Sequence, residues 1–425
     1  MRADWLTPAE AWSRIRSSLE TLRPETRSLH DALGHVLAEE IASPLDLPPW
    51  DNSAMDGFAA RAADVRGASD ERPVVLRVVE DIPAGRQPSR PIGKGEATRI
   101  MTGAPVPEGA DSVIRVEHTN GGVEIGGPTA SVTVRSDGDA GRNIRRRGED
   151  VRTGEEVLRR GTVLAPAHLG VAAGMGRSQL SVVRRPSVAV LASGDELVEV
   201  DGFSEALAGR RIVSTNSYTL RAQLAGLAAE VRMLGIAADR PDDLRKRLEG
   251  ARGVDALITS AGVSVGEHDH LRAVLADLGL EDSFWRIGMR PGSPFAFGRV
   301  RALGGIPWFG LPGNPVSSMV GCEVFVKPAL RTMAGRSRLH GPVVPARPRE
   351  SISLKPGLVH FLRVRLLEGE GTAHAIPTGP QGSGILTSMA AADGLLVAEG
   401  ESLDPKRDYP VMLLGDAGLS ERPPF

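Results

Sequence analysis

The sequence predicts a multidomain protein of α/β and β structure, built around a doubly wound α/β domain. Its 425 residues exceed the length of a typical single domain. Between residues 187 and 330, apolar runs alternate with helix-forming segments, as in parallel sheets covered on both faces. Elsewhere, short apolar runs separated by Gly, Pro and Asp are typical of β-rich units.

Composition narrows the class of protein. Lys and Arg number 51 against 53 Asp and Glu, a net charge of −2 that provides no attraction to nucleic acid or to an anionic membrane. The single cysteine, Cys322, excludes an internal disulfide framework and fits a reducing compartment. No apolar run approaches the ~20 residues that span a bilayer, and the N-terminus lacks a signal-peptide core. We therefore expect a cytoplasmic protein that binds neither nucleic acid nor a membrane.

The N-terminal region is predicted to begin with two helices and continue as a β-rich unit. Thr7, Pro8 and Glu10 form a helix-start pattern that predicts a helix over residues 7–19. A second helix is predicted from Ser28 to about Ile41. The β-like runs that follow are 74–79, 112–117 and 131–134. We expect the two helices to pack against the base of this β-rich unit.

The middle and the end of the chain are predicted to form two further units. In the middle unit the expected strands are 187–193, 230–236, 254–260, parts of 284–298, and 306–311, and the expected helices are 217–228, one from Pro241, 269–278, and one from 314. A proline-rich linker then leads to a small β domain with strands at 360–366 and 394–398. This order of strands and helices favours a parallel sheet with helices on both faces.

Four clusters of small and polar residues follow the predicted strands of the middle unit, at 193–196, 214–217, 260–269 and 311–315. Ligands of doubly wound sheets bind beyond the carboxyl ends of the strands, where backbone N–H groups can approach an anion. Carboxylates within these clusters would repel a bare phosphate unless Mg²⁺ lies between them. The alternative is a set of ordinary turns with acidic helix caps. The candidate substrate-binding residues are Ser193, Gly194, Asn216, Ser260, Gly262, Ser264, Gly313 and Asn314.

Two further patterns are less specific. Residues 262–266 match the G-x-S-x-G pattern of serine hydrolases, but Ser264 lies in mid-loop rather than on a strand-to-helix turn, which argues against that class. The basic run 142–147 is either a solvated loop or a phosphate-binding segment, and the acidic pair that follows Gly148 favours an anion together with a metal.

At these residues the chain closely resembles the molybdopterin molybdenumtransferases, the family of the MoeA proteins and the gephyrin E domain. The motifs that carry the resemblance occur in the same order over essentially the whole chain. They are Asp51-Asn52-Ser53-Ala54-Met55-Asp56-Gly57, Met101-Thr102-Gly103-Ala104, Arg147-Gly148-Glu149-Asp150, Ser193-Gly194-Asp195-Glu196-Leu197, the 260–269 loop, Arg290-Pro291-Gly292 and residues 311–317. The 187–330 unit alone is less specific, because molybdopterin adenylyltransferases share it.

The resemblance implies an elongated homodimer and a domain plan. The N-terminal region would span 1–185, with a helical base formed by 1–45 and about 146–185 and an inserted β-rich lobe of about 46–145. A molybdopterin-binding α/β domain at 186–335 and a C-terminal β domain at 340–425 would follow. The implied reaction converts adenylylated molybdopterin and molybdate into molybdenum cofactor and AMP, with Mg²⁺ as the cation. Contacts with the adenylyltransferase and with molybdoenzyme chaperones are also implied.

The resemblance also implies roles for individual residues. The catalytic candidates are Asp56, Thr102, Asp150, Glu196, Asp239 and Asp269. Glu196 and Asp269 are the preferred metal or pyrophosphate-side carboxylates. Arg290, Arg363 and Ser388 are placed on the molybdate side. The implied dimer would join the halves of one site, with Asp56 from one subunit and Asp269 from the other.

Four positions depart from the family pattern. Arg286 and Arg290 stand where relatives often have Lys, Ser293 stands where some have Lys, and Ala261 replaces the second loop glycine. A guanidinium fork and a compact ammonium are not equivalent at a small oxyanion. Two rival functions remain open: a gephyrin-like scaffold without catalysis, and an adenylyltransferase that loads molybdopterin with AMP from ATP.

Overall fold

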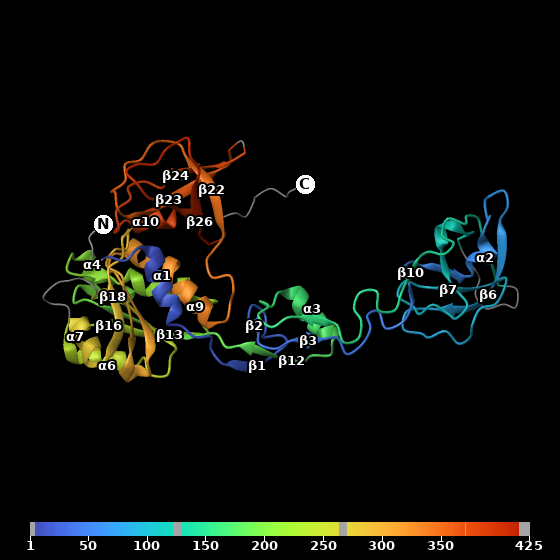
Figure 1. Ribbon diagram of the computed structural model, residues 1–425, viewed down its shortest axis with the longest axis horizontal. Coiled ribbons are helices and arrows are strands. Elements are labelled where there is room, and N and C mark those ends of the chain that lie inside the picture. The colour runs from blue at the N-terminus through green and yellow to red at the C-terminus, as the bar shows by residue number, and fades with distance from the viewer. Residues whose placement is uncertain (1–4, 122–129, 263–269, 370, 416–425) are drawn as a thin grey trace. The chain divides into compact units, whose positions relative to one another are not determined.

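The computed structural model describes residues 5–121, 130–262, 270–369 and 371–415 (Figure 1). The chain divides into two compact units, each with its own hydrophobic cores. The first unit comprises 1–27, 34–38 and 181–425, and the second comprises 28–33 and 39–180. No helix in the described ranges is long and apolar enough to cross a membrane.

A mixed sheet forms the centre of the first unit. Its described strands lie in the order β16 (Glu230–Ala237), β13 (Ser187–Ser193), β17 (Ala256–Ser260), β21 (Ile306–Leu311), β20 (Ala296–Val300) and β18 (Leu280–Trp285). The first four strands are parallel, which confirms the prediction for that part of the sheet. The expected parallel pairing does not extend to the other edge, where β20 and β18 form antiparallel pairs. Short connections between these last strands permit only hairpin pairing.

Helices cover both faces of this sheet (Figure 1). They are α1 (Pro8–Ser17), α5 (Thr215–Leu224), α6 (Pro241–Glu249), α7 (His270–Asp277), α8 (Pro315–Gly321) and α9 (Lys327–Met333). Successive side chains of a strand point to opposite faces, so Val188 and Val190 pack with α1, α5, α8 and α9. Ala189 and Leu191 pack with α6 and α7 on the other face. The predicted doubly wound arrangement is therefore confirmed.

The C-terminal part of the first unit is a closed barrel. Its strands are β22 (Val343–Pro348), β23 (Val359–Leu367), β24 (Ala373–Pro377), β25 (Gly394–Ala398) and β26 (Tyr409–Leu413), with α10 (Leu386–Ala390) in one connection. They pair in the order β23-β24-β22-β26-β25, and β25 pairs with β23 to close the ring. A short strand from the α/β domain, β19 (Met289–Arg290), adds to β23 in parallel, with Arg290 opposite His360.

Local signals at the N-terminus give one confirmed helix and two errors. The confirmed helix α1 packs through Ala11 and Ile15 in the core of the first unit and not, as expected, against the β-rich unit. Thr7 and Glu10 form the expected capping box, in which the Thr7 backbone N–H donates to Glu10 Oε2 at 2.8 Å. The helix predicted over 28–41 is wrong, because this segment contains the end of β1 (Pro24–Ser28), then β2 (Val36–Leu37) and β3 (Ile41–Ala42). Gly34 adopts a left-handed φ of +74°, and the following residues pair with β12 (Gln179–Val183). Pairing with a distant strand overrides the local helical pattern.

The second unit is β-rich, as predicted. One sheet has the order β8 (Ser112–Arg115), β5 (Gly57–Ala60), β7 (Glu96–Ile100), β6 (Val74–Ile82) and β9 (Ser131–Val134). Two shorter pairs join β4 (Asn52–Ser53) to β10 (Ile144–Arg145), and β3 to β11 (Glu156–Leu158). Its helices are α2 (Ala62–Val65) and α3 (Pro166–Gly174). Gly57 is required at its position, because a Cβ there would lie 2.0 Å from the Ile114 carbonyl oxygen of β8.

Candidate functional site

A cavity of about 870 Å³ lies beyond the carboxyl ends of β13, β17 and β21, and we call it the sheet-edge cavity. Six of the sequence candidates line it: Glu196, Asn216, Ser260, Gly262, Gly313 and Asn314. They come from all four polar clusters, so the structure brings those clusters together. The rule that ligands bind beyond the strand ends therefore predicted the lining of this cavity.

Asn216 joins three of the clusters at the cavity floor. Its side-chain Nδ2 donates to Ser260 Oγ at 2.9 Å and to the Gly313 carbonyl at 2.8 Å. Asn216 is only 7% exposed, and its buried Oδ1 has no hydrogen-bond partner among the described residues. An unpaired buried acceptor is costly, so a donor group on a bound ligand would stabilise this arrangement.

Carboxylates gather after β13 and β16. Gly194, which follows the buried Ser193, has a φ of +144°, a backbone conformation that residues with a Cβ rarely adopt, and a Cβ there would force the Glu196 carboxylate to move. The Asp239 backbone N–H donates to Asp195 Oδ1 at 3.1 Å. Burial raises the pKa of Asp239, and the charges of Asp195 and Glu196 raise it further. This concentration of negative charge favours a cation in the neighbourhood.

The described residues do not by themselves complete a metal centre. Within the described ranges, no three His, Cys, Asp or Glu side chains are grouped closely enough to hold an ion. Asp269, the predicted partner of Glu196, and Ser264 both lie outside the described residues. The metal assignment therefore stays a prediction.

The loop after β17 begins with two residues in the left-handed region. Ala261 has a φ of +77° and Gly262 a φ of +71°. A Cβ on Gly262 would lie 2.7 Å from Leu271 Cδ2 of α7, so this glycine is required by packing as well as by conformation. Ala261, where the family pattern has glycine, adopts a conformation that an alanine visits only at a cost.

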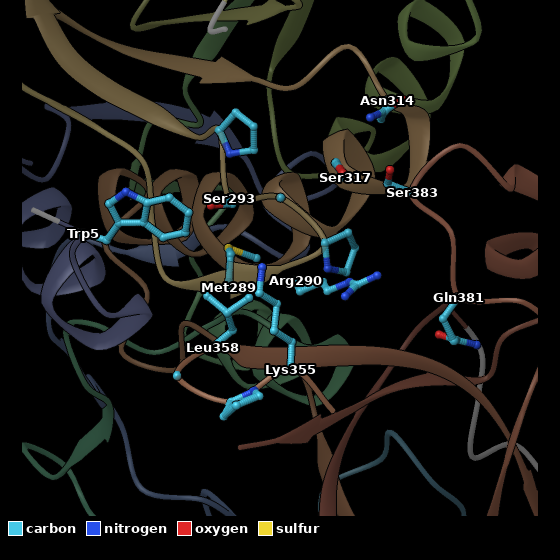
Figure 2. Close-up of a pocket in the computed structure, with 15 residues that line it drawn as sticks. Trp5, Met289, Arg290, Ser293, Asn314, Ser317, Lys355, Leu358, Gln381 and Ser383 are labelled. Atoms are coloured by element: carbon cyan, nitrogen blue, oxygen red, sulfur yellow. The ribbon is translucent and has the colours of Figure 1, made fainter. Parts of the chain in front are cut away.

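A second cavity, of about 650 Å³, lies between the α/β domain and the barrel, and we call it the barrel-side cavity (Figure 2). Arg290 and Lys355 line it, and the described lining contains no Asp or Glu. The Oγ atom of Ser293, another lining residue, is buried without a hydrogen-bond partner among the described residues. Two cations and free polar hydrogens are the groups that an oxyanion requires.

The two cavities adjoin, because Pro294 and Asn314 line both of them. One compartment therefore suits a small anion, and its neighbour suits a larger molecule with apolar and hydrogen-bonding parts. This arrangement is suited to a reaction that joins an oxyanion to a second, larger substrate.

Arg363 and Ser388 lie behind the cavity walls. Arg363 is 1% exposed and donates from Nε to Ser388 Oγ at 3.1 Å and from Nη2 to the Gly382 carbonyl at 3.0 Å. Its backbone N–H donates to Gln381 Oε1 at 2.9 Å. Burial lowers the pKa of Arg363. These bonds fix the loop that carries Gln381 and Ser383 into the barrel-side cavity, so Arg363 shapes this cavity from behind its wall.

Arg286 and Arg290 occupy different environments. Arg290 lines the barrel-side cavity, whereas Arg286 lies over the ring of Trp5, 5.6 Å from its centroid. Trp5 itself lines the cavity, and Figure 2 shows it on one side of the group that includes Arg290. Of these two arginines, only Arg290 is therefore among the described lining residues.

The second unit contains the remaining candidates. Asp56 Oδ1 accepts hydrogen bonds from the Thr102 backbone N–H at 2.7 Å and from Thr102 Oγ1 at 2.9 Å. Both hydrogen bonds from Thr102 lower the pKa of Asp56, and the bond from the backbone N–H contributes more. Both residues are exposed, as is Asp150. An exposed, ionised carboxylate held in one orientation can bind a cation or a hydroxyl group.

Part of the basic run has a structural role. Arg146 Nη1 donates to Asp51 Oδ2 at 2.6 Å, and Arg147 Nε donates to Asp46 Oδ2 at 2.7 Å. Arg145 is exposed and lies in β10. Two of the arginines thus brace the loop that precedes Asp150.

Sequence reasoning missed Lys355, Gln381 and Trp5. Lys355 is one of only five lysines in a chain rich in arginine, a bias that could have marked it. Gln381 lies in 378–384 (TGPQGSG), which has the same composition as the four clusters but falls in the barrel. Trp5 carried no signal, because its place in the cavity depends on a bridge between Leu6 and Ile287.

Comparisons with known proteins agree with this architecture. Residues 6–176 match the MoeA N-terminal region (domain I and II), 189–332 match a probable molybdopterin binding domain, and 345–403 match the MoeA C-terminal region (domain IV). A crystal structure of molybdopterin biosynthesis moeA protein from Pyrococcus horikoshii is 28% identical and has a TM-score of 0.80. The match covers 97% of this chain and 100% of that one.

Curated relatives support the same family. Molybdopterin molybdenumtransferase 2 of Mycobacterium tuberculosis is 39% identical over 90% of this chain and 92% of its own length. Molybdopterin molybdenumtransferase of Staphylococcus aureus is 33% identical over 95% of this chain and 94% of its own length. The chain therefore belongs to the molybdopterin molybdenumtransferase family, and it is a transferase of molybdenum cofactor biosynthesis.

Proposed function

We propose that the protein inserts molybdate into adenylylated molybdopterin and releases AMP and molybdenum cofactor, as a cytoplasmic homodimer that uses Mg²⁺. The observation that carries the proposal is the pair of adjoining cavities with shared walls at Pro294 and Asn314. Molybdate would bind beside Arg290 and Lys355, and the adenylylated pterin would bind in the sheet-edge cavity. The two substrates would then meet without either leaving its compartment.

Residues of this chain would divide the work. Asn216 would accept a hydrogen bond from the larger substrate through its free Oδ1. Arg290 and Lys355 would offset the loss of molybdate hydration by fixed positive charge. Glu196, which lines the sheet-edge cavity, offers the carboxylate oxygens that Mg²⁺ prefers, and Asp269 is its proposed partner. When bound, Mg²⁺ would neutralise charge on the pyrophosphate link.

The test is an assay of AMP release from adenylylated molybdopterin, with and without molybdate and Mg²⁺. The transferase should release AMP only when molybdate is present. A scaffold would release none, and an adenylyltransferase would instead load molybdopterin with AMP from ATP. Asn216→Ala should raise the KM for the adenylylated pterin, because it removes both the ligand contact and the bonds that join the clusters.

The proposed homodimer is tested by mixing inactive subunits. Asp56→Ala and Asp269→Ala variants should each be inactive, and verified mixed dimers should regain part of the activity. Mixed dimers that stay inactive would show that these two residues do not serve complementary subunits. Equilibrium sedimentation of the wild-type protein measures the assembly state directly. We also propose that the adenylyltransferase and molybdoenzyme chaperones contact this dimer, as suppliers of substrate and receivers of product.

A further inference from the structure

The segment 199–212, which we call the arm, leaves large apolar side chains exposed beside the sheet-edge cavity. It runs from the end of β14 (Leu197–Val198) to the first residue of β15 (Ile212–Val213), two strands that pair in parallel, and it contains α4 (Phe203–Leu207). Phe203 is 52% exposed and Leu207 is 75% exposed. Apolar surface left in water is unfavourable, so a ligand that covers it gains affinity.

The arm has a defined structure rather than a loose one. Glu205 accepts two hydrogen bonds at 2.8 Å from the Arg210 guanidinium, and the Glu205 carbonyl accepts the Arg210 backbone N–H at 3.0 Å. The Ile212 backbone N–H donates to the Glu196 carbonyl at 2.8 Å. The exposed side chains are therefore presented from a fixed backbone.

Only some of these exposed side chains face the cavity. Phe203, Ala206 and Ile212 line it, whereas Leu207 is not among its lining residues. The rest of the apolar lining includes three prolines and Leu386, which give rigid, flat surfaces. An aromatic ring beside such surfaces suits a flat heterocycle, because stacked rings prefer an offset, face-to-face contact.

A cation lies at the end of the arm. Arg211 lines the cavity and forms no salt bridge among the described residues, although its charge acts on the nearby Glu205, which is paired with Arg210. At the cavity floor, the buried Oδ1 of Asn216 lacks a donor. A ligand with a flat ring, a phosphate and an N–H or O–H donor would satisfy all three groups.

We propose that the arm is the recognition element for the flat heterocycle of the phosphate-bearing substrate, with Phe203 stacked on the ring and Arg211 paired with a phosphate. This inference rests on the proposed function, since the adenylylated pterin contains two such rings, adenine and pterin. The shared chemistry is a planar nitrogen heterocycle joined to a phosphate. The arm thus determines specificity for the larger substrate and has no part in molybdate binding.

The test measures dissociation constants of the full-length protein for AMP, adenosine and 6-hydroxymethylpterin by calorimetry. Phe203→Ala should weaken binding of one ring about tenfold. The ring whose binding is weakened, adenine or pterin, is the one that stacks on Phe203. Phe203→Trp should retain affinity. The matched control is Leu207→Ala, on the same helix but outside the lining, which should bind like the wild type. Unchanged melting temperatures confirm folding of each variant.

The charge is tested with neighbouring arginines. Arg211→Ala should weaken AMP about tenfold and leave adenosine unchanged, whereas Arg210→Ala should change neither. The inference is overturned if Phe203→Ala and Leu207→Ala bind both rings alike, or if Arg210→Ala matches Arg211→Ala. Suppose that the wild type releases AMP only with molybdate, and that Phe203→Ala and Arg211→Ala have unaltered KM values for the adenylylated pterin. That result would overturn the inference about the arm and leave the proposed function in place. A wild-type protein that binds the rings but releases no AMP would overturn the proposed function and leave the arm in place.

Discussion

Replacement of Lys355 by Met should raise the molybdate KM about tenfold. A cavity of about 650 Å³ has the volume of a sphere whose radius is roughly 5 Å, so a centred dianion lies about that far from a wall cation. At this distance, in a dielectric close to that of water, one positive charge attracts a dianion by about 1.5 kcal/mol. That free energy corresponds to a factor of about ten in affinity. Lys355 is exposed, which justifies the water-like dielectric.

The assay is AMP release at varied molybdate with saturating adenylylated pterin. Lys406→Met is the matched control, since Lys406 is an exposed lysine of the same barrel region outside the cavity lining. Its molybdate KM should equal that of the wild type. The difference caused by Lys355→Met should shrink at about 1 M salt, where the screening length falls to about 3 Å. An unchanged molybdate KM in Lys355→Met, or an equal rise in the control, would refute this reasoning.

Three other predictions concern buried groups. Arg363→Lys should lower the free energy of unfolding by about 2–4 kcal/mol and raise the KM of both substrates. A lysine ammonium cannot replace both guanidinium hydrogen bonds, to Ser388 and to Gly382. Urea titration measures the stability, and steady-state kinetics measure the two KM values. Asp255→Asn should cost about 2–3 kcal/mol at pH 7. Burial raises the pKa of Asp255, but hydrogen bonds from Arg184 and Ser187 outweigh burial and hold the pKa below its ordinary 3.8. The stability that this carboxylate gives the wild type is therefore lost as pH falls from about 3.8 through the folded pKa, whereas Asp255→Asn has no such loss. Urea midpoints of both proteins at pH 7 and pH 3 test this difference. Cys322 should react with iodoacetamide only after unfolding, because burial raises the pKa of its thiol.

Each of these has a contrary outcome. Full stability in Arg363→Lys would mean that the loop is held by other contacts. An Asp255→Asn protein with the same acid sensitivity as the wild type would assign that sensitivity to other carboxylates. Rapid alkylation of Cys322 in the folded protein would show that the helix pair around it opens readily.

Local sequence signals predicted much of the first unit. The capping box at Thr7, the apolar run 187–193 and the proline at 241 each mark an element through contacts within a few residues. The helix prediction for 28–41 failed because β2 depends on pairing with Val182 and Val183, about 145 residues away along the chain, and β3 depends on pairing with β11. Propensity carries no information about such a partner.

The candidate site also has a part that the sequence predicts and a part that depends on tertiary packing. Asn216, Ser260 and Gly313 could be predicted because parallel strands place their carboxyl ends at one edge. The barrel-side cavity could not, because Trp5, Arg290, Lys355 and Gln381 come from four segments that meet only through tertiary packing. The resemblance places Arg363 on the molybdate side, which stays a prediction, and its burial behind the loop is visible only in the structure.

The pairing of β19 with β23 has a mechanical consequence. Arg290 belongs to the α/β domain along the chain, yet its strand is a member of the barrel sheet, opposite His360. A hinge that separated these two domains would have to break this pairing, so the wall that holds Arg290 stays in fixed register with the barrel. The α/β wall and the barrel wall of the barrel-side cavity are therefore joined by backbone pairing. A shift of the barrel would carry Arg290 with it, so the spacing between Arg290 and the barrel wall is preserved.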